Sequence, residues 1–110
     1  MVAITLDLKS MRASAGQACE LMKILANPER LLICCQLSQQ EMCVSEIESS
    51  LGIVQPTLSQ QLTVLRKANL VTTRRDGKNI YYQLVSEPVL AIMSTLYQEF
   101  CANQKTRRKQ

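Results

Sequence analysis

A short glycine turn between two amphipathic segments constrains this chain more than any other feature. Residues 44–51 have helical spacing and end at Gly52, the residue type that most readily adopts the left-handed conformation that closes a helix. Only two residues separate this glycine from a second helical segment, which starts near Gln55. A helix, a tight turn and a second helix have the spacing of a helix-turn-helix, which we place at about residues 44–68.

The second segment has the two faces expected of a helix that reads DNA. Pro56 suits the first helical position, because its missing N–H would have no partner there. Leucines at positions 58, 62 and 65 recur at spacings of four and three and therefore share one face. The opposite face is polar, and such side chains can hydrogen-bond base edges in the major groove. The side chains expected to face bases or the adjacent backbone are Gln55, Thr57, Ser59, Gln60 and Thr63.

A β-hairpin is predicted directly after this helix, at about residues 70–85. Residues 71–75 and 80–84 alternate as strands do, and Asp76-Gly77 between them is a strong hairpin-turn signal. Basic side chains gather at the tip, where they are placed to hold phosphates. The tip residues expected to contact DNA are Arg74, Arg75, Lys78 and Asn79. A solvated loop is the alternative interpretation, but the helix before the hairpin favours the wing of a winged helix-turn-helix.

Positive charge is concentrated on these two elements. The chain of 110 residues has a net charge of +4, and residues 55–82 alone hold five basic side chains and one acidic one. A focused basic region is the electrostatic footprint of a protein that binds a polyanion such as DNA. The length predicts a single domain over residues 1–110, and an aliphatic composition with 4% aromatic residues predicts a mainly α-helical fold.

Three further helices are predicted around the helix-turn-helix. Long apolar helices at about residues 8–26 and 87–104 have wide apolar stripes, and we expect them to pair with a second copy across a two-fold axis. Between the first of these and the helix-turn-helix, Asn27-Pro28-Glu29 signals another helix start. The expected inward residues of that helix are Leu31, Leu32, Cys35 and, loosely, Leu37.

The composition argues against several other classes of protein. No apolar run approaches the roughly 18 residues of a membrane span, and the start of the sequence lacks the pattern of a secretory signal. Five cysteines in irregular spacing do not form a disulfide framework, so we expect a reducing, cytoplasmic compartment. Without histidine, a glycine-rich phosphate loop or clustered carboxylates, the chain offers no nucleophile–base pair. We therefore expect neither an enzyme nor a bound cofactor.

Three segments carry a resemblance to a known family. They are Leu25-Ala-Asn-Pro-Glu-Arg-Leu-Leu-Ile33, Gln55-Pro-Thr-Leu-Ser-Gln-Gln-Leu62 and Leu70-Val-Thr-Thr-Arg-Arg-Asp-Gly-Lys-Asn-Ile-Tyr-Tyr82. Together they resemble the ArsR family of bacterial transcriptional repressors, and the resemblance covers about residues 15–101. Within that family the chain looks most similar to the sulfide- and redox-responsive branch that includes BigR, SqrR and HlyU. The resemblance implies a homodimer that binds inverted-repeat operators on double-stranded DNA when it is reduced.

The resemblance also implies a dithiol switch. This branch carries one cysteine on its second helix and one on its last, and those positions correspond here to Cys35 and Cys101. It implies that reactive sulfur species or an oxidant bridge the pair, as a disulfide or polysulfide, and that DNA is then released. From the residues alone, each cysteine also fits a small buried hydrophobe. Two alternatives stay open: a thiolate metal or arsenite site formed by Cys34, Cys35 and Cys43, and a winged-helix regulator without redox response.

Overall fold

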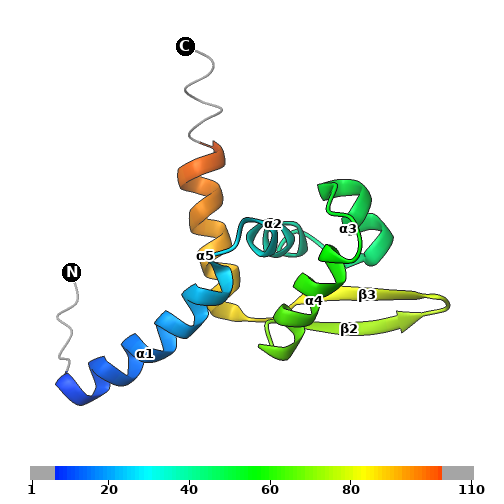
Figure 1. Ribbon diagram of the computed structural model, residues 1–110. Coiled ribbons are helices and arrows are strands. Elements are labelled where there is room, and N and C mark those ends of the chain that lie inside the picture. Colours follow the sequence, from blue (N-terminus) through cyan, green and yellow to red (C-terminus); the bar gives the residue numbers. More distant parts are fainter. Residues whose placement is uncertain (1–6, 103–110) are drawn as a thin grey trace, which may run out of the picture.

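The computed structural model describes residues 7–102 of the chain (Figure 1). Its elements are α1 (Leu8–Leu25), α2 (Pro28–Leu37), β1 (Met42–Cys43), α3 (Val44–Leu51), α4 (Thr57–Lys67), β2 (Val71–Asp76), β3 (Asn79–Leu84), α5 (Glu87–Leu96) and the π-helical segment η1 (Tyr97–Ala102). The predicted class, mainly α-helical with a hairpin wing, is confirmed. Residues 103–104, the predicted end of the last helix, lie outside the described residues. No helix in the described part is both long and apolar enough to cross a membrane.

Two of the helices start where the sequence signals a cap. At the start of α2, the side-chain oxygen of Asn27 accepts a hydrogen bond from the backbone N–H of Arg30 at 3.1 Å. At the start of α5, the hydroxyl of Ser86 accepts from the backbone N–H of Val89 at 3.3 Å. Each bond satisfies an N–H that has no partner inside its helix. These caps fix where α2 and α5 begin, and hence where Cys35 of α2 and Cys101 of η1, which continues α5, lie.

The core lies between α2, the helix-turn-helix and the base of the hairpin. Leu58, Leu62 and Leu65 of α4 are at most 2% exposed, which confirms the predicted inward face of that helix. Gly52 adopts a φ of +70° at the end of α3, as expected of the turn residue. The leucines therefore anchor α4 while its other face remains open to solvent.

The inward face of α2 differs from the prediction. Ile33 and Cys34 are fully buried, whereas Leu32 is 48% exposed and Cys35 is half-buried at the edge of the core. Leu37 is buried as predicted, and Leu31 and Cys35 pack against the core, so Leu32 is the predicted inward residue that was wrong, while Ile33 and Cys34 were missed. Residues 31–35 are all apolar, so their spacing does not distinguish one face. Cys35 remains accessible and Cys34 is enclosed.

The wing is part of a three-stranded antiparallel sheet with the strand order β1-β3-β2. The pairing of Asp76 with Asn79 leaves Gly77 and Lys78 as the two turn residues, with Gly77 at a φ of +64°. The predicted turn, Asp76-Gly77, was therefore wrong by one residue. Strand β1 was not predicted, because two residues are too few to show an alternating pattern.

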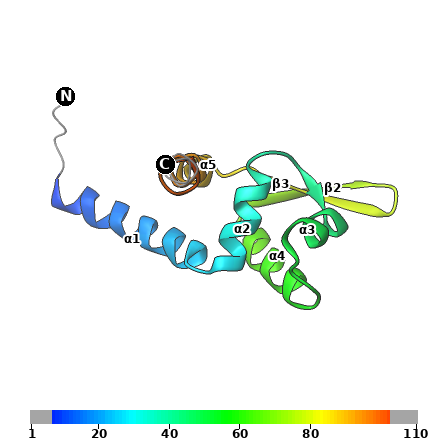
Figure 2. The same cartoon turned by 90° about the horizontal axis from the view of Figure 1, so that it is seen from above.

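Helix α1 extends away from the body of the molecule (Figures 1 and 2). Leu25, at its last turn, is the one residue of this helix that is buried. Leu8, Met11 and Met22 are 63%, 44% and 55% exposed. Most of the stability of a helix in a protein comes from packing of its apolar face, and this face of α1 is left open in the single chain.

Candidate DNA-binding surface and dithiol groove

The outward face of α4 carries the polar side chains expected to read DNA. Ser59, Gln60 and Thr63 are exposed, and Thr57 is half-buried at the first turn. The hydroxyl of Thr63 donates to the backbone carbonyl of Ser59 at 2.8 Å, which fixes its rotamer on the helix. The face thus combines a long flexible amide at position 60 with short hydroxyls held close to the backbone.

Gln55 caps the start of this helix with its side chain. Its side-chain oxygen accepts hydrogen bonds from the backbone N–H of Ser59 at 3.0 Å and from the Ser59 hydroxyl at 2.7 Å. Pro56 occupies the cap position and α4 begins at Thr57, one residue later than the sequence predicted. Gln55 therefore takes over the capping that proline cannot provide, and only its amide nitrogen is left to donate to DNA.

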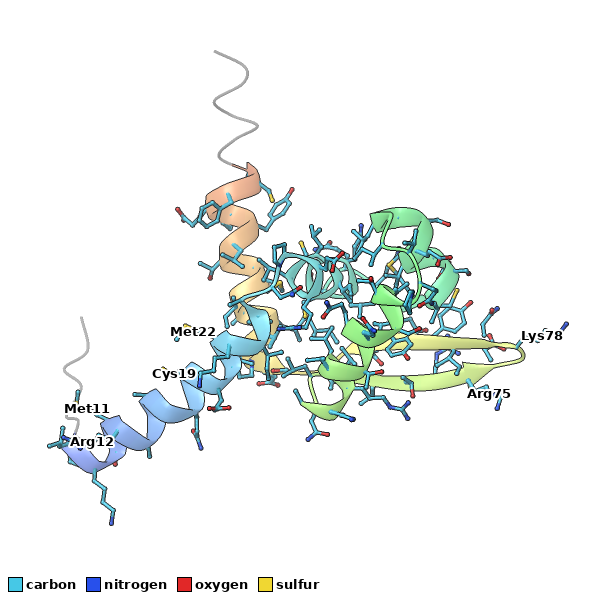
Figure 3. All side chains as sticks on the ribbon, viewed as in Figure 1. Met11, Arg12, Cys19, Met22, Arg75 and Lys78 are labelled. Atoms are coloured by element: carbon cyan, nitrogen blue, oxygen red, sulfur yellow. The ribbon has the colours of Figure 1, made fainter. Side chains whose placement is uncertain are left out.

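The hairpin tip presents cations to solvent. Arg75 and Lys78 lie at the end of the hairpin, away from the helices (Figure 3). The side chain of Arg75 donates to the carbonyl of Gly77 at 3.3 Å, and Asn79 is exposed beside the turn. An exposed cation on a flexible side chain is suited to bind phosphate, because this interaction depends on charge more than on exact geometry.

Arg74 differs from the other residues of the predicted tip. Its Nε lies 2.9 and 3.0 Å from the two carboxylate oxygens of Glu41, and its guanidinium carbon lies 4.6 Å from the centre of the Tyr81 ring. The carboxylate of Asp76 lies 3.9 Å from the same guanidinium. The hydrogen bond from Arg74 is the main cause that lowers the pKa of Glu41. Arg74 is thus exposed but engaged in intramolecular contacts, with a partner that the sequence did not indicate.

Arg30 and Gln61 form a second connection that the sequence did not predict. Arg30 donates from Nε to the carbonyl of Ile24 at 2.6 Å and from a terminal nitrogen to the side-chain oxygen of Gln61 at 2.9 Å. One side chain of α2 therefore joins the end of α1 to α4. The sequence offered no signal for it, since Arg30 and Gln61 are separated by 31 residues.

Cys35 and Cys101 line the same apolar groove, of about 430 Å³, between α2 and the α5–η1 helix. The other lining residues are Leu31, Leu32, Met93, Leu96, Tyr97 and Phe100. Cys101 is exposed and Cys35 is half-buried. Burial is the main cause that raises the pKa of Cys35, and the neighbouring Cys101 thiol adds to it. Both causes act in the same direction, so the Cys35 thiol is mostly protonated at neutral pH.

The other cysteines lie in different surroundings. Cys34 is fully buried, and burial raises its pKa to about 11, so it is a poor nucleophile. Cys43 is buried with its sulfur 3.2 Å from the Ser45 hydroxyl, and Cys19 is exposed on α1. Within residues 7–102, no three cysteine or carboxylate side chains converge on a point that would hold a metal ion. The structure therefore does not assemble the three-thiolate site of Cys34, Cys35 and Cys43.

Comparisons with known proteins agree with this architecture. The family model described as "Bacterial regulatory protein, arsR family" matches residues 27–73. The biofilm growth-associated repressor of Agrobacterium fabrum is 44% identical over 91% of this chain and 86% of its own length. The crystal structure of the transcriptional repressor BigR from Xylella fastidiosa has a TM-score of 0.80 at 41% identity, covering 87% of this chain and 98% of that one.

A second solved structure has a similar fold over a similar share of the chain. Reduced HlyU from Vibrio cholerae has a TM-score of 0.82 at 37% identity, covering 86% of this chain and 99% of that one. The likeness therefore extends over most of the chain, well beyond the residues 27–73 that the family model matches. This chain belongs to the ArsR family of bacterial transcriptional regulators and has their winged helix-turn-helix fold.

Proposed function

We propose that this chain is a homodimeric transcriptional repressor that binds inverted-repeat operators and releases them when Cys35 and Cys101 become bridged. The observation that carries the proposal is that the two thiols share one groove between α2 and α5–η1. Gln55, Thr57, Ser59, Gln60 and Thr63 face bases or backbone, while Arg75, Lys78 and Asn79 contact phosphates. In a two-fold dimer, two copies of α4 would meet successive major grooves about one helical turn apart.

The exposure of the two thiols gives them an order of reaction. Cys101, the exposed thiol, attacks the terminal sulfur of a low-molecular-weight persulfide RS–SH and expels RS⁻, leaving a persulfide on Cys101. The Cys35 thiolate then attacks the Cys101 sulfur and releases HS⁻, leaving a disulfide. The two protein thiols are oxidised and the persulfide is reduced to RSH and H₂S. If both cysteines first form persulfides, the outer sulfur of one attacks the inner sulfur of the other and releases HS⁻, which leaves a polysulfide bridge with one extra sulfur.

The bridge acts on DNA binding through the elements that the two cysteines belong to. Cys35 lies on α2, and α2 contacts α4 through the Arg30–Gln61 hydrogen bond. Cys101 lies on η1, which continues α5, one of the two helices assigned to the dimer interface. A covalent link between them favours a dimer shape in which the two α4 helices no longer fit the operator. Coupling of about 1–3 kcal/mol corresponds to a loss of affinity of roughly 5- to 150-fold.

Replacing Lys78 by alanine is expected to weaken binding to every DNA sequence, because a phosphate contact carries no sequence information. The slope of log affinity against log salt concentration should become shallower by about 0.9 for each phosphate that the variant no longer neutralises. Fluorescence anisotropy titrations at several salt concentrations measure both quantities. Lys23→Ala, which removes the same charge from exposed α1, is the matched control. An unchanged slope in the Lys78 variant would exclude the tip as a phosphate-binding element.

Replacing Gln60 by alanine is expected to reduce specificity rather than general affinity. The exposed amide of Gln60 can form paired hydrogen bonds with a base edge, and such a contact is worth about 1–3 kcal/mol of discrimination. The operator is first selected from a random duplex pool with the wild-type protein. The ratio of affinities for that operator and for a random duplex should then fall in the variant. Gln17→Ala on α1 should leave the ratio unchanged, and equal ratios in all three proteins would remove Gln60 from the reading surface.

A further inference from the structure

We propose that Glu41 and Arg74 are positioning residues for DNA binding, because their ion pair, laid across Tyr81, fixes the wing against the helix-turn-helix. The inference rests on the proposed DNA-binding function. It gives Arg74 a different task from Arg75 and Lys78, its neighbours at the hairpin tip.

The sheet geometry shows what the ion pair connects. Tyr81 of β3 is paired with Arg74 of β2 on one side and with Cys43 of β1 on the other. Glu41 immediately precedes β1. The Arg74 side chain therefore extends from β2 across the ring on the central strand to the residue beside β1. It reaches the two carboxylate oxygens of Glu41, at 2.9 and 3.0 Å from Nε, and the Tyr81 ring at 4.6 Å. One side chain thus spans all three strands.

The position of β1 makes this connection relevant to DNA. Strand β1 is only two residues long and leads directly into α3, the first helix of the helix-turn-helix. The tip, in contrast, belongs to the β2–β3 hairpin, and a two-stranded hairpin is by itself only marginally stable. The direction in which Arg75 and Lys78 point relative to α4 therefore depends on how firmly the hairpin is held to β1. The operator must meet α4 and the tip at the same time, so a loosely held wing costs affinity.

The surroundings of Arg74 favour positioning over phosphate binding. Its guanidinium already donates to the Glu41 carboxylate from both Nε and a terminal nitrogen and lies over an aromatic face, and both interactions favour a fixed geometry. To bind a phosphate it would have to leave Glu41, and the freed carboxylate would then repel the DNA. The hydrogen bond with Glu41 is also the main cause that raises the pKa of Arg74. Among residues 7–102, no carboxylate forms an ion pair with Lys78, in the turn itself.

The variant Glu41→Gln distinguishes the two roles by the sign of its effect. The probe is a fluorescein-labelled duplex of random sequence, titrated by anisotropy at several salt concentrations. If the pair positions the wing, affinity should fall by about 3- to 10-fold while the salt slope stays the same. If Arg74 contacts phosphate, removal of the competing carboxylate should increase the affinity and steepen the slope. That increase would overturn the inference.

The second measurement is the DNA affinity of a variant in which Glu41 and Arg74 exchange their charges. The double variant Glu41→Arg with Arg74→Glu keeps the net charge and can re-form the ion pair in the opposite sense. It should bind the duplex more tightly than Arg74→Glu alone; equally weak binding by the two contradicts the positioning role. In the free protein, Glu41→Gln should accelerate amide hydrogen exchange of β1 and β3, and unchanged exchange counts equally against the inference. Wild-type protein that does not bind the duplex would contradict the proposed function itself, whereas tighter binding by Glu41→Gln alone contradicts only this assignment.

Discussion

The Cys101→Ser variant is expected to bind its operator as tightly as the reduced wild-type protein and to remain bound after treatment with a persulfide. Serine cannot accept a sulfane sulfur or form the bridge, and the exposed position of Cys101 tolerates the change. The wild-type protein should lose roughly 5- to 150-fold in affinity under the same treatment. Anisotropy titrations before and after addition of cysteine persulfide measure the difference. Mass spectrometry should detect the Cys35–Cys101 bridge only in the wild type.

The remaining cysteines provide matched controls. Cys35→Ser should abolish the response as Cys101→Ser does, while Cys19→Ser and Cys43→Ser should keep it. The control at position 34 is Cys34→Ala, because a serine hydroxyl in that fully buried site would lack a partner. Release of the operator by the treated Cys101 variant would show that the two-thiol switch is wrong. Loss of the response in the Cys43 variant would instead assign sensing to the start of α3.

The helix-turn-helix and the hairpin were predictable because their signals are local. Leucines at spacings of four and three fix the inner face of α4, and Gly52 closes α3 within the same segment. The hairpin follows from alternation over six residues and from Gly77, since its turn requires a positive φ. In each case the interacting residues lie within one short continuous segment, so the local pattern of the sequence identifies them.

The interactions that join these elements were not predictable, because they depend on how the elements pack. Arg74 meets Glu41 across 33 residues, and Arg30 meets Gln61 across 31. Neither pair has a sequence pattern that distinguishes it from the other surface charges and amides. The pairing of Cys35 with Cys101 came from the family resemblance and not from the residues. The structure adds the groove that the two thiols line.

The substitution Met22→Glu is expected to convert a dimer into a monomer. The exposed face of α1 carries Leu8, Met11 and Met22, and the helix packs on its own body only at its last turn. A second copy would bury this face, and a carboxylate placed there without a counter-charge is strongly unfavourable. Light scattering at micromolar concentration should give 12.4 kDa for the variant and twice that mass for the wild type. Affinity for the inverted repeat should fall on the order of 100-fold or more, because each half-site then binds alone.

Gln17→Glu separates the effect of the interface from that of the added charge. Position 17 lies five residues before Met22, about 140° around the helix, and is exposed on the other side of α1. The variant adds the same negative charge without changing the size of the side chain, and it should remain a dimer with nearly wild-type DNA affinity. Circular dichroism should show folded protein in both variants, with some loss of helicity in Met22→Glu because its α1 has no partner. A dimeric Met22→Glu protein would exclude this face of α1 from the interface and leave the exposed Tyr97 and Phe100 of η1 as the surface through which two copies meet.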